Sequence, residues 1–229
     1  MRTAAIIVAA GRGTRMGGAR SKIALPIAGS AMLTRVVRAF ASHPAINDVI
    51  VVGDPREVEE ILGAETAAGV TIVPGGERRQ DSVRAGLDRI GEAEMVLVHD
   101  AARPLVPADV IGRVLGEAAR SGAAIPGVPI DDTVKRIAPD GAVRETVPRE
   151  GLIRVQTPQG FRADLLRTAF AKAGEDQFVA TDEASLVEHA GGRVTVVPGV
   201  ATNIKITRPG DLLLAEAIAR VTSSGSDDV

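Results

Sequence analysis

The chain has 229 residues with 27 basic and 29 acidic side chains, so its net charge does not favour a polyanionic partner. The absence of Cys excludes disulfides and thiolate metal sites. With no Trp or Tyr and four Phe, aromatic platforms for single-stranded nucleic acid are not expected. No apolar run reaches membrane-spanning length and no signal peptide opens the chain, so we expect a cytoplasmic protein without nucleic-acid or membrane partners.

The first segment of the chain combines an apolar run with a basic, glycine-rich loop. Residues 4–10 are small and β-branched, which predicts a buried strand. In the loop that follows, Gly11 and Gly13 would let backbone N–H groups approach an anion, and Arg15 and Lys22 would neutralise its charge. A P-loop is excluded because no Gly-Lys pair exists, and a dinucleotide fingerprint is excluded because methionine stands at its third glycine position. The remaining pattern resembles the signature loop of nucleotidyltransferases; a glycine-rich turn with solvated charges is the alternative.

Apolar runs and amphipathic segments then alternate along the chain. Further buried strands are predicted at residues 48–52, 70–73, 95–99 and 123–128. Helices are predicted at residues 32–40, 58–62, 82–90 and 110–119. This alternation predicts an α/β fold, namely a Rossmann-like three-layer α/β/α arrangement with a mainly parallel sheet. Ligands of such sheets bind beyond the carboxyl ends of the strands, where several of the predicted loops would converge.

Residues 129–152 break the alternation of strands and helices. Two segments of alternating polarity, 132–137 and 142–147, flank a Pro-Asp-Gly turn, which predicts a β-hairpin. Because an exposed hairpin edge needs cover, we expect an arm that packs on a second subunit and makes a homodimer. A hairpin that lies on its own domain is the alternative.

The remaining segments complete one expected domain over residues 1–222. Helices are predicted at residues 163–173, 182–190 and 210–221, and short strands at 193–197 and 203–206. The small, polar tail at residues 223–229 is expected to be disordered.

Asp100 follows directly on the strand predicted at residues 95–99. A carboxylate at that place suits a Mg²⁺ ion that bridges triphosphate oxygens, so Mg²⁺ is the expected cofactor. A cap for the following turn, or a salt bridge to Arg103, is the alternative. His99 is expected to be packed or hydrogen-bonded rather than catalytic.

Seven short motifs occur in order between Ala9 and Pro209. They are AAGRGTRM, Gly-Gly followed by ERRQDSV, VHDAARP, DDTVKR, QTPQGF, TDEAS and NIKITRP. Together they resemble the 2-C-methyl-D-erythritol 4-phosphate cytidylyltransferase family. The resemblance implies transfer of CMP from CTP to methylerythritol phosphate, with release of pyrophosphate, Mg²⁺ as cofactor, and no covalent enzyme intermediate.

The resemblance also implies roles for individual residues. Arg15 and Lys22 would stabilise the transition state, and Asp100 would hold the metal. The nucleotide would be bound by Ala9, Ala10, Gly11, Gly13, Gly76, Glu77, Ser82 and Ala101. The methylerythritol phosphate would be bound by Arg103, Thr157, Lys205, Thr133 and Arg149. The last two belong to the arm and would reach the substrate from a partner subunit.

Two other functions remain open from the sequence. A cytidylyltransferase for ribitol phosphate or another polyol phosphate would use the same chemistry. A non-catalytic nucleotide-binding or regulatory protein could share the fold, since fold alone does not decide function.

Overall fold

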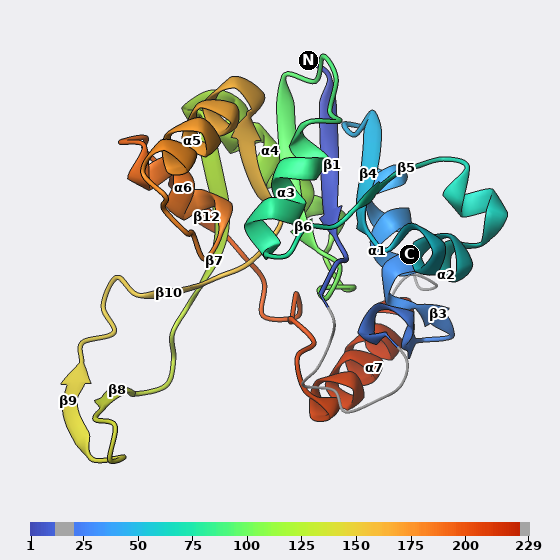
Figure 1. Ribbon diagram of the computed structural model, residues 1–229. Coiled ribbons are helices and arrows are strands. Elements are labelled where there is room, and N and C mark those ends of the chain that lie inside the picture. The colour runs from blue at the N-terminus through green and yellow to red at the C-terminus, as the bar shows by residue number, and fades with distance from the viewer. Residues whose placement is uncertain (12–20, 225–229) are drawn as a thin grey trace.

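The structure, a computed structural model, describes residues 1–11 and 21–224, and a central sheet organises it (Figure 1). The strand order is β10-β7-β11-β6-β1-β4-β5, with β12 paired to β7. The strands are β1 (Thr3–Val8), β4 (Asp48–Gly53), β5 (Thr71–Pro74), β6 (Met95–Asp100), β7 (Ala123–Pro129), β10 (Ile153–Val155), β11 (Gln159–Arg162) and β12 (Thr195–Pro198). The pairs β1–β4, β1–β6, β4–β5 and β7–β12 are parallel, whereas β10 and β11 run antiparallel to their neighbours.

Helices cover both faces of this sheet. The helices are α1 (Met32–Ala41), α2 (Pro55–Ala67), α3 (Arg79–Leu87), α4 (Ala108–Ser121), α5 (Ala163–Glu175) and α6 (Glu183–His189). One core cluster joins the sheet to α3, α5 and α6, and a second joins it to α1, α2 and α4. Strand β1 is buried on both faces: Ala4 and Ile6 belong to the first cluster, and Ala5 and Ile7 to the second. This alternation follows from the two-residue period of a strand. The predicted three-layer α/β/α fold is confirmed.

A smaller unit packs beside the carboxyl edge of the sheet. It contains the short helix η2 (Lys22–Ala24), the strand pair β2 (Pro26–Ile27) and β3 (Ser30–Ala31), and the long helix α7 (Pro209–Ser224). Buried Ile27, Met32 and Ile206 pack with Ala215 and Ala219 of α7. Helix α7 therefore continues into the tail that was expected to be disordered, and residues 225–229 lie outside the described part.

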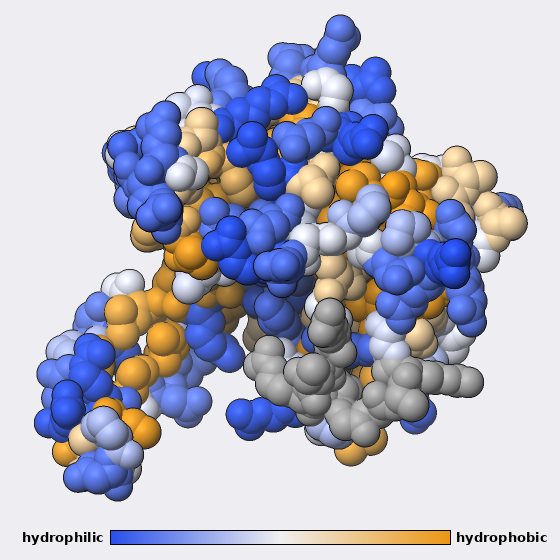
Figure 2. Space-filling view, viewed as in Figure 1, coloured by the Kyte–Doolittle hydropathy of each residue, from blue (hydrophilic) through white to orange (hydrophobic). Residues whose placement is uncertain are grey.

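The predicted hairpin consists of β8 (Val134–Ile137) and β9 (Val143–Val147), and it projects away from the body of the molecule (Figure 1). The alternative of a hairpin lying on its own domain is therefore wrong. Ile137 and Val143 pair across the two strands and are 62% and 60% exposed. Figure 2 shows apolar side chains gathered on this arm. Such a patch is unusual for a surface that water alone covers.

Several stretches of backbone differ from the sequence-based expectation. Strands β10 and β11 were not predicted, because β11 is short and carries Gln159 and Gly160 in place of an apolar alternation. Gly160 is required there, since a Cβ would lie 2.8 Å from Val114 Cγ1. Conversely, the strand predicted at residues 203–206 is absent from the structure, because the backbone of Asn203 and Ile206 bonds to side chains and to a loop instead of a strand.

Among the described residues, no helix is both long enough and apolar enough to cross a membrane.

Two glycines in helices test how tightly α3 is packed on the sheet. A Cβ on Gly86 of α3 would lie 2.6 Å from Ile6 Cγ2 and 3.0 Å from Val52 Cγ2, both in the core. We expect Gly86→Ala to lower the free energy of unfolding by about 1–3 kcal/mol, because overpacking forces side chains off their rotamers. Gly116→Ala on α4, where nothing lies within 4 Å, is the matched control and is expected to raise it by about 0.5–1 kcal/mol. Urea titrations measure both values, and equal effects at the two positions would contradict this packing.

Candidate active site

The loops after the parallel strands meet at one edge of the sheet. Backbone bonds link them directly: Ala9 N donates to Val52 O (2.7 Å), and Ala101 N donates to Val8 O (3.1 Å). Strands β1, β4, β5 and β6 therefore end side by side, which places the residues that follow them close together at the carboxyl edge of the sheet.

The turn after β5 packs against the end of β1. A Cβ on Gly75 would collide with Cβ of Ala10, so only glycine allows this approach. Gly76 N donates to the hydroxyl of buried Ser82 (3.0 Å), which itself donates to the backbone carbonyl four residues earlier (3.1 Å). Ser82 thus holds the turn in shape, and exposed Glu77 lies on that turn.

Asp100 lies at the centre of this edge, and its side chain is 10% exposed. Lys205 Nζ lies 2.6 Å from Oδ2, and Arg79 Nε donates to Oδ1 at 3.1 Å. Burial would raise the pKa of Asp100, but the charges of Arg79 and Lys205 outweigh burial and hold that pKa well below the usual value. The alternative salt bridge to Arg103 is wrong, because that guanidinium donates to the carbonyls of Val155 and Asn203.

Arg79 also pairs with a second carboxylate, that of Glu183. Its two terminal nitrogens donate to Glu183 Oε1 (2.7 Å) and Oε2 (3.0 Å). Burial raises the pKa of Glu183 and the guanidinium of Arg79 opposes that rise, while the two-pronged geometry is that of an ionised carboxylate. The two carboxylates together hold the pKa of Arg79 above its usual value, in spite of burial.

A chain of hydrogen bonds fixes the backbone at Asp100. His99 Nε2 donates to Arg103 O (3.0 Å), so His99 Nδ1 is free to accept from the hydroxyl of Thr157 (3.1 Å). The same hydroxyl accepts from Asp100 N (3.1 Å). His99 is completely buried, as the sequence predicted for a packed histidine, and burial lowers its pKa to about 4.

The segment before α7 is hydrogen-bonded to Gln156 and Thr157. Buried Asn203 donates to Thr157 O (2.9 Å), and Gln156 donates to the carbonyls of Val200 (2.8 Å) and Asn203 (3.3 Å). Lys22 Nζ donates to Ile206 O (2.7 Å), directly beside Lys205. Lys22 of η2 and Lys205 are the two lysines predicted from the sequence, and both therefore lie at this short segment.

The sequence-predicted residues fall into three groups. Those that the structure brings together at this edge are Ala9, Ala10, Gly76, Glu77, Ser82, Asp100, Ala101, Arg103, Thr157, Lys22 and Lys205. Thr133 and Arg149 lie on the arm, away from this edge, where Arg149 donates to Asp131 O (Figure 1). Gly11 ends the first described segment, and Gly13 and Arg15 lie outside the described residues.

Four residues of the site were missed by sequence reasoning. Arg79 and Glu183 lie inside the quoted motifs ERRQDSV and TDEAS, and Gln156 and Asn203 begin the motifs QTPQGF and NIKITRP. Their place in these motifs was the available signal. The contact between Arg79 and Glu183 spans 104 residues of sequence, so no local sequence pattern reveals it.

The donor set suits Mg²⁺ bound jointly with a nucleotide. Within the described residues, no three His, Cys, Asp or Glu side chains gather as a potential metal cage. Mg²⁺ is commonly held by one or two carboxylates together with substrate phosphates, so Asp100 is the residue that could hold it here.

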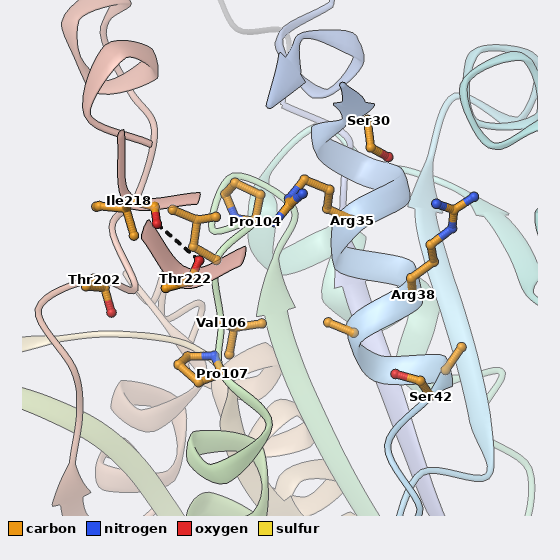
Figure 3. Close-up of a pocket in the computed structure, with 13 residues that line it drawn as sticks. Ser30, Arg35, Arg38, Ser42, Pro104, Val106, Pro107, Thr202, Ile218 and Thr222 are labelled. Carbon is orange, nitrogen blue, oxygen red and sulfur yellow. Dashed lines mark hydrogen bonds between the residues drawn. The ribbon is translucent and has the colours of Figure 1, made fainter. Parts of the chain in front are cut away.

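A separate pocket of about 820 Å³ lies next to this site, between α1 and α7 (Figure 3). Its walls include Pro104–Pro107 and Thr202, which adjoin Arg103 and Asn203 in sequence. Of the sequence-predicted site residues that the structure describes, none lines it.

The sheet is mainly parallel, and its carboxyl edge carries an ion-paired carboxylate, lysines and a close-packed glycine turn. These features define the class of nucleotide-binding α/β proteins. The chain belongs to the 2-C-methyl-D-erythritol 4-phosphate cytidylyltransferase family, whose family model matches residues 3–221.

Individual relatives agree with this family over nearly the whole chain. The protein of that name from Acidobacterium capsulatum is 45% identical, across 98% of this chain and 100% of its own length. That from Streptomyces coelicolor is 47% identical, across 95% and 84%. The crystal structure of the Thermus thermophilus protein of that name is similar with a TM-score of 0.81 and 40% identity, covering 96% of this chain and 100% of that one. The predicted family is confirmed.

The buried, neutral His99 predicts a pH-dependent stability. Between its pKa of about 4 in the folded protein and 6.5 in the unfolded chain, only the unfolded chain binds the extra proton. The free energy of unfolding should therefore fall by up to about 3 kcal/mol as the pH drops from 6.5 to 4. Urea titrations across this range on the natural protein and on His99→Gln, which keeps a donor for Arg103 O, isolate the effect. Equal slopes in the two proteins would contradict it.

Proposed function

We propose that the chain transfers CMP from CTP to 2-C-methyl-D-erythritol 4-phosphate and releases pyrophosphate, as a step of non-mevalonate isoprenoid biosynthesis. The observation that carries this proposal is the meeting of Asp100, Lys205, Lys22 and Thr157 at the carboxyl edge, beside the end of the glycine-rich loop's strand. Family membership supplies the identity of the substrates. A cytoplasmic location stays a prediction.

In the proposed reaction, a phosphate oxygen of the acceptor attacks the α-phosphorus of CTP. The bond between this phosphorus and the oxygen that bridges to the β-phosphate breaks, and pyrophosphate leaves with that oxygen. The attacking phosphate is already anionic near neutral pH, so no general base is needed. Catalysis then depends on positioning and on cations placed where negative charge grows, the role we assign to Arg15 and Lys22.

The nucleotide side of the site is assigned to backbone groups around the glycine turn. Gly75 packs against Ala10 there, which brings the neighbouring backbone of Ala9 and Gly76 to the same turn. Carbonyl acceptors can distinguish the N4 amino group of cytosine from the oxygen of uracil. Mg²⁺ held by Asp100 would draw charge from the triphosphate oxygens.

The acceptor side is assigned to Lys205, Thr157 and Arg103. Lys205 is 41% exposed, so its ammonium has room to turn from Asp100 to a phosphate, and Arg79 would remain as the cation beside Asp100. Arg103 holds the walls of the site together through its two backbone carbonyl partners.

We further propose a homodimer in which each arm completes the partner's site. The first support is the exposed apolar pair Ile137 and Val143 on the hairpin, where Figure 2 shows apolar side chains gathered. The second is that Thr133 directly precedes β8 and Arg149 follows β9, so both belong to the arm that projects from the body of their own subunit (Figure 1). Packing this hairpin on a second copy would remove its apolar surface from water.

A substrate panel tests the proposed reaction. Pyrophosphate release is measured with Mg²⁺ for the four ribonucleoside triphosphates, each combined with methylerythritol phosphate or ribitol 5-phosphate. Release is expected for CTP with methylerythritol phosphate alone. Release with ribitol phosphate would overturn the acceptor assignment, and no release from folded protein would overturn the reaction.

Complementation between subunits tests the role of the arm. Lys22→Ala and Arg149→Ala are each expected to lower turnover more than about tenfold, because each removes a cation that meets phosphate. Co-expressed together, half of the dimers would be mixed and would hold one intact site of two, giving about a quarter of normal activity. Arg144→Ala, elsewhere on the arm, is the control and should leave turnover unchanged. Activity no higher than that of the parent variants would mean that the arm serves its own subunit.

A further inference from the structure

The two oxygens of Asp100 have partners of different kinds. Oδ2 faces Lys205, an exposed lysine on an irregular segment. Oδ1 accepts from Arg79, whose remaining nitrogens are committed to Glu183. One partner of Asp100 is therefore exchangeable and the other is anchored.

Glu183, which anchors Arg79, lies at the start of a helix that is itself bonded to the sheet. Glu183 is 1% exposed and begins α6, whose N-cap Asp182 accepts from Ser185 N (3.0 Å) and from Gln159 Nε2 (2.7 Å). Gln159 Oε1 in turn accepts from Ala184 N (3.1 Å). Gln159 belongs to β11, which pairs with β6, the strand that ends in Asp100. The position of Arg79 is thus set by the same sheet that sets the position of Asp100.

We propose that Arg79 is a positioning residue of the transfer site: held by Glu183, it binds Oδ1 of Asp100 and leaves Oδ2, the oxygen beside Lys205, as the one that would hold Mg²⁺. This inference rests on the proposed function, because it needs Asp100 to be the metal ligand. Neither Arg79 nor Glu183 is among the binding and catalytic residues assigned above.

The chemistry favours this role for arginine in particular. A lone carboxylate that holds a metal depends on its outer partner for orientation. A guanidinium can serve one carboxylate through Nε while its terminal nitrogens grip another, whereas the ammonium of lysine is a single point of charge.

A purely structural role is the competing explanation, since the Arg79–Glu183 pair also joins α3 to α6. The two explanations differ in what they predict for metal affinity. A structural brace affects the stability of the fold, whereas a positioning residue affects the affinity for metal in protein that is still folded.

The test is a titration of Mn²⁺ into the full chain with α,β-methylene CTP, with free Mn²⁺ followed by electron paramagnetic resonance. Arg79→Lys and Glu183→Gln are each expected to weaken Mn²⁺ binding by about tenfold or more. Arg84→Gln removes an exposed arginine of the same helix, paired with Asp88, and should bind Mn²⁺ as the natural protein does.

A double variant guards against misfolding. Arg79→Met with Glu183→Met removes both charges, leaves neither partner of the pair as an unpaired buried charge, and should stay folded. It is also expected to bind Mn²⁺ about tenfold more weakly.

The contrary outcomes are distinct. Normal or tighter Mn²⁺ binding by folded variants, with only a lower unfolding temperature, would overturn the role of Arg79 and leave the proposed function standing. Failure of the natural protein to bind Mn²⁺ with the CTP analogue would overturn the metal assignment itself and this inference with it.

Discussion

Asp100 carries a negative charge where its side chain is almost removed from water, and two cations hold it there. Burying an unpaired carboxylate would cost several kcal/mol, of the order of a domain's entire stability, so Arg79 and Lys205 have to come close. That requirement brings α3 and the segment before α7 to the end of β6. Because Arg79 also binds Glu183, the start of α6 is drawn to the same place. The need to pair the buried charge of Asp100 therefore determines which elements meet at the site.

Hydrogen bonds between uncharged groups fix the backbone positions at the same edge. His99 stays uncharged because it is buried, and this lets Thr157 bond to His99 and to the backbone of Asp100 at once. Asn203 then ties the segment before α7 to Thr157. These contacts hold together the part of the proposed phosphate-transfer site that lies on the body of the protein. The other proposed part lies on an arm that projects from that body and has apolar surface to cover.

Sequence reasoning succeeded where local pattern and tertiary structure agree. The buried strands and amphipathic helices were predictable because their apolar periodicity reflects a sheet covered on both faces. It failed at β11, where Gly160 and Gln159 make contacts with other elements, and at residues 203–206, whose backbone bonds to side chains and loops instead of a neighbouring strand. Within the site, Asp100 was predictable from its place after a buried strand. Arg79 was not assigned, because its role depends on two carboxylates far apart in sequence.

Asp100→Asn is the most direct measurement of the central claim, that the charge on Asp100 organises a cytidylyl-transfer site. Asparagine keeps the size of the side chain and the backbone bond to Thr157, but it removes the charge that Arg79, Lys205 and Mg²⁺ would share. With CTP, methylerythritol phosphate and Mg²⁺, formation of the cytidine diphosphate product should fall by about a hundredfold or more, as expected when an electrostatic contributor of this kind is lost. Turnover close to that of the natural protein, from folded variant, would contradict the account.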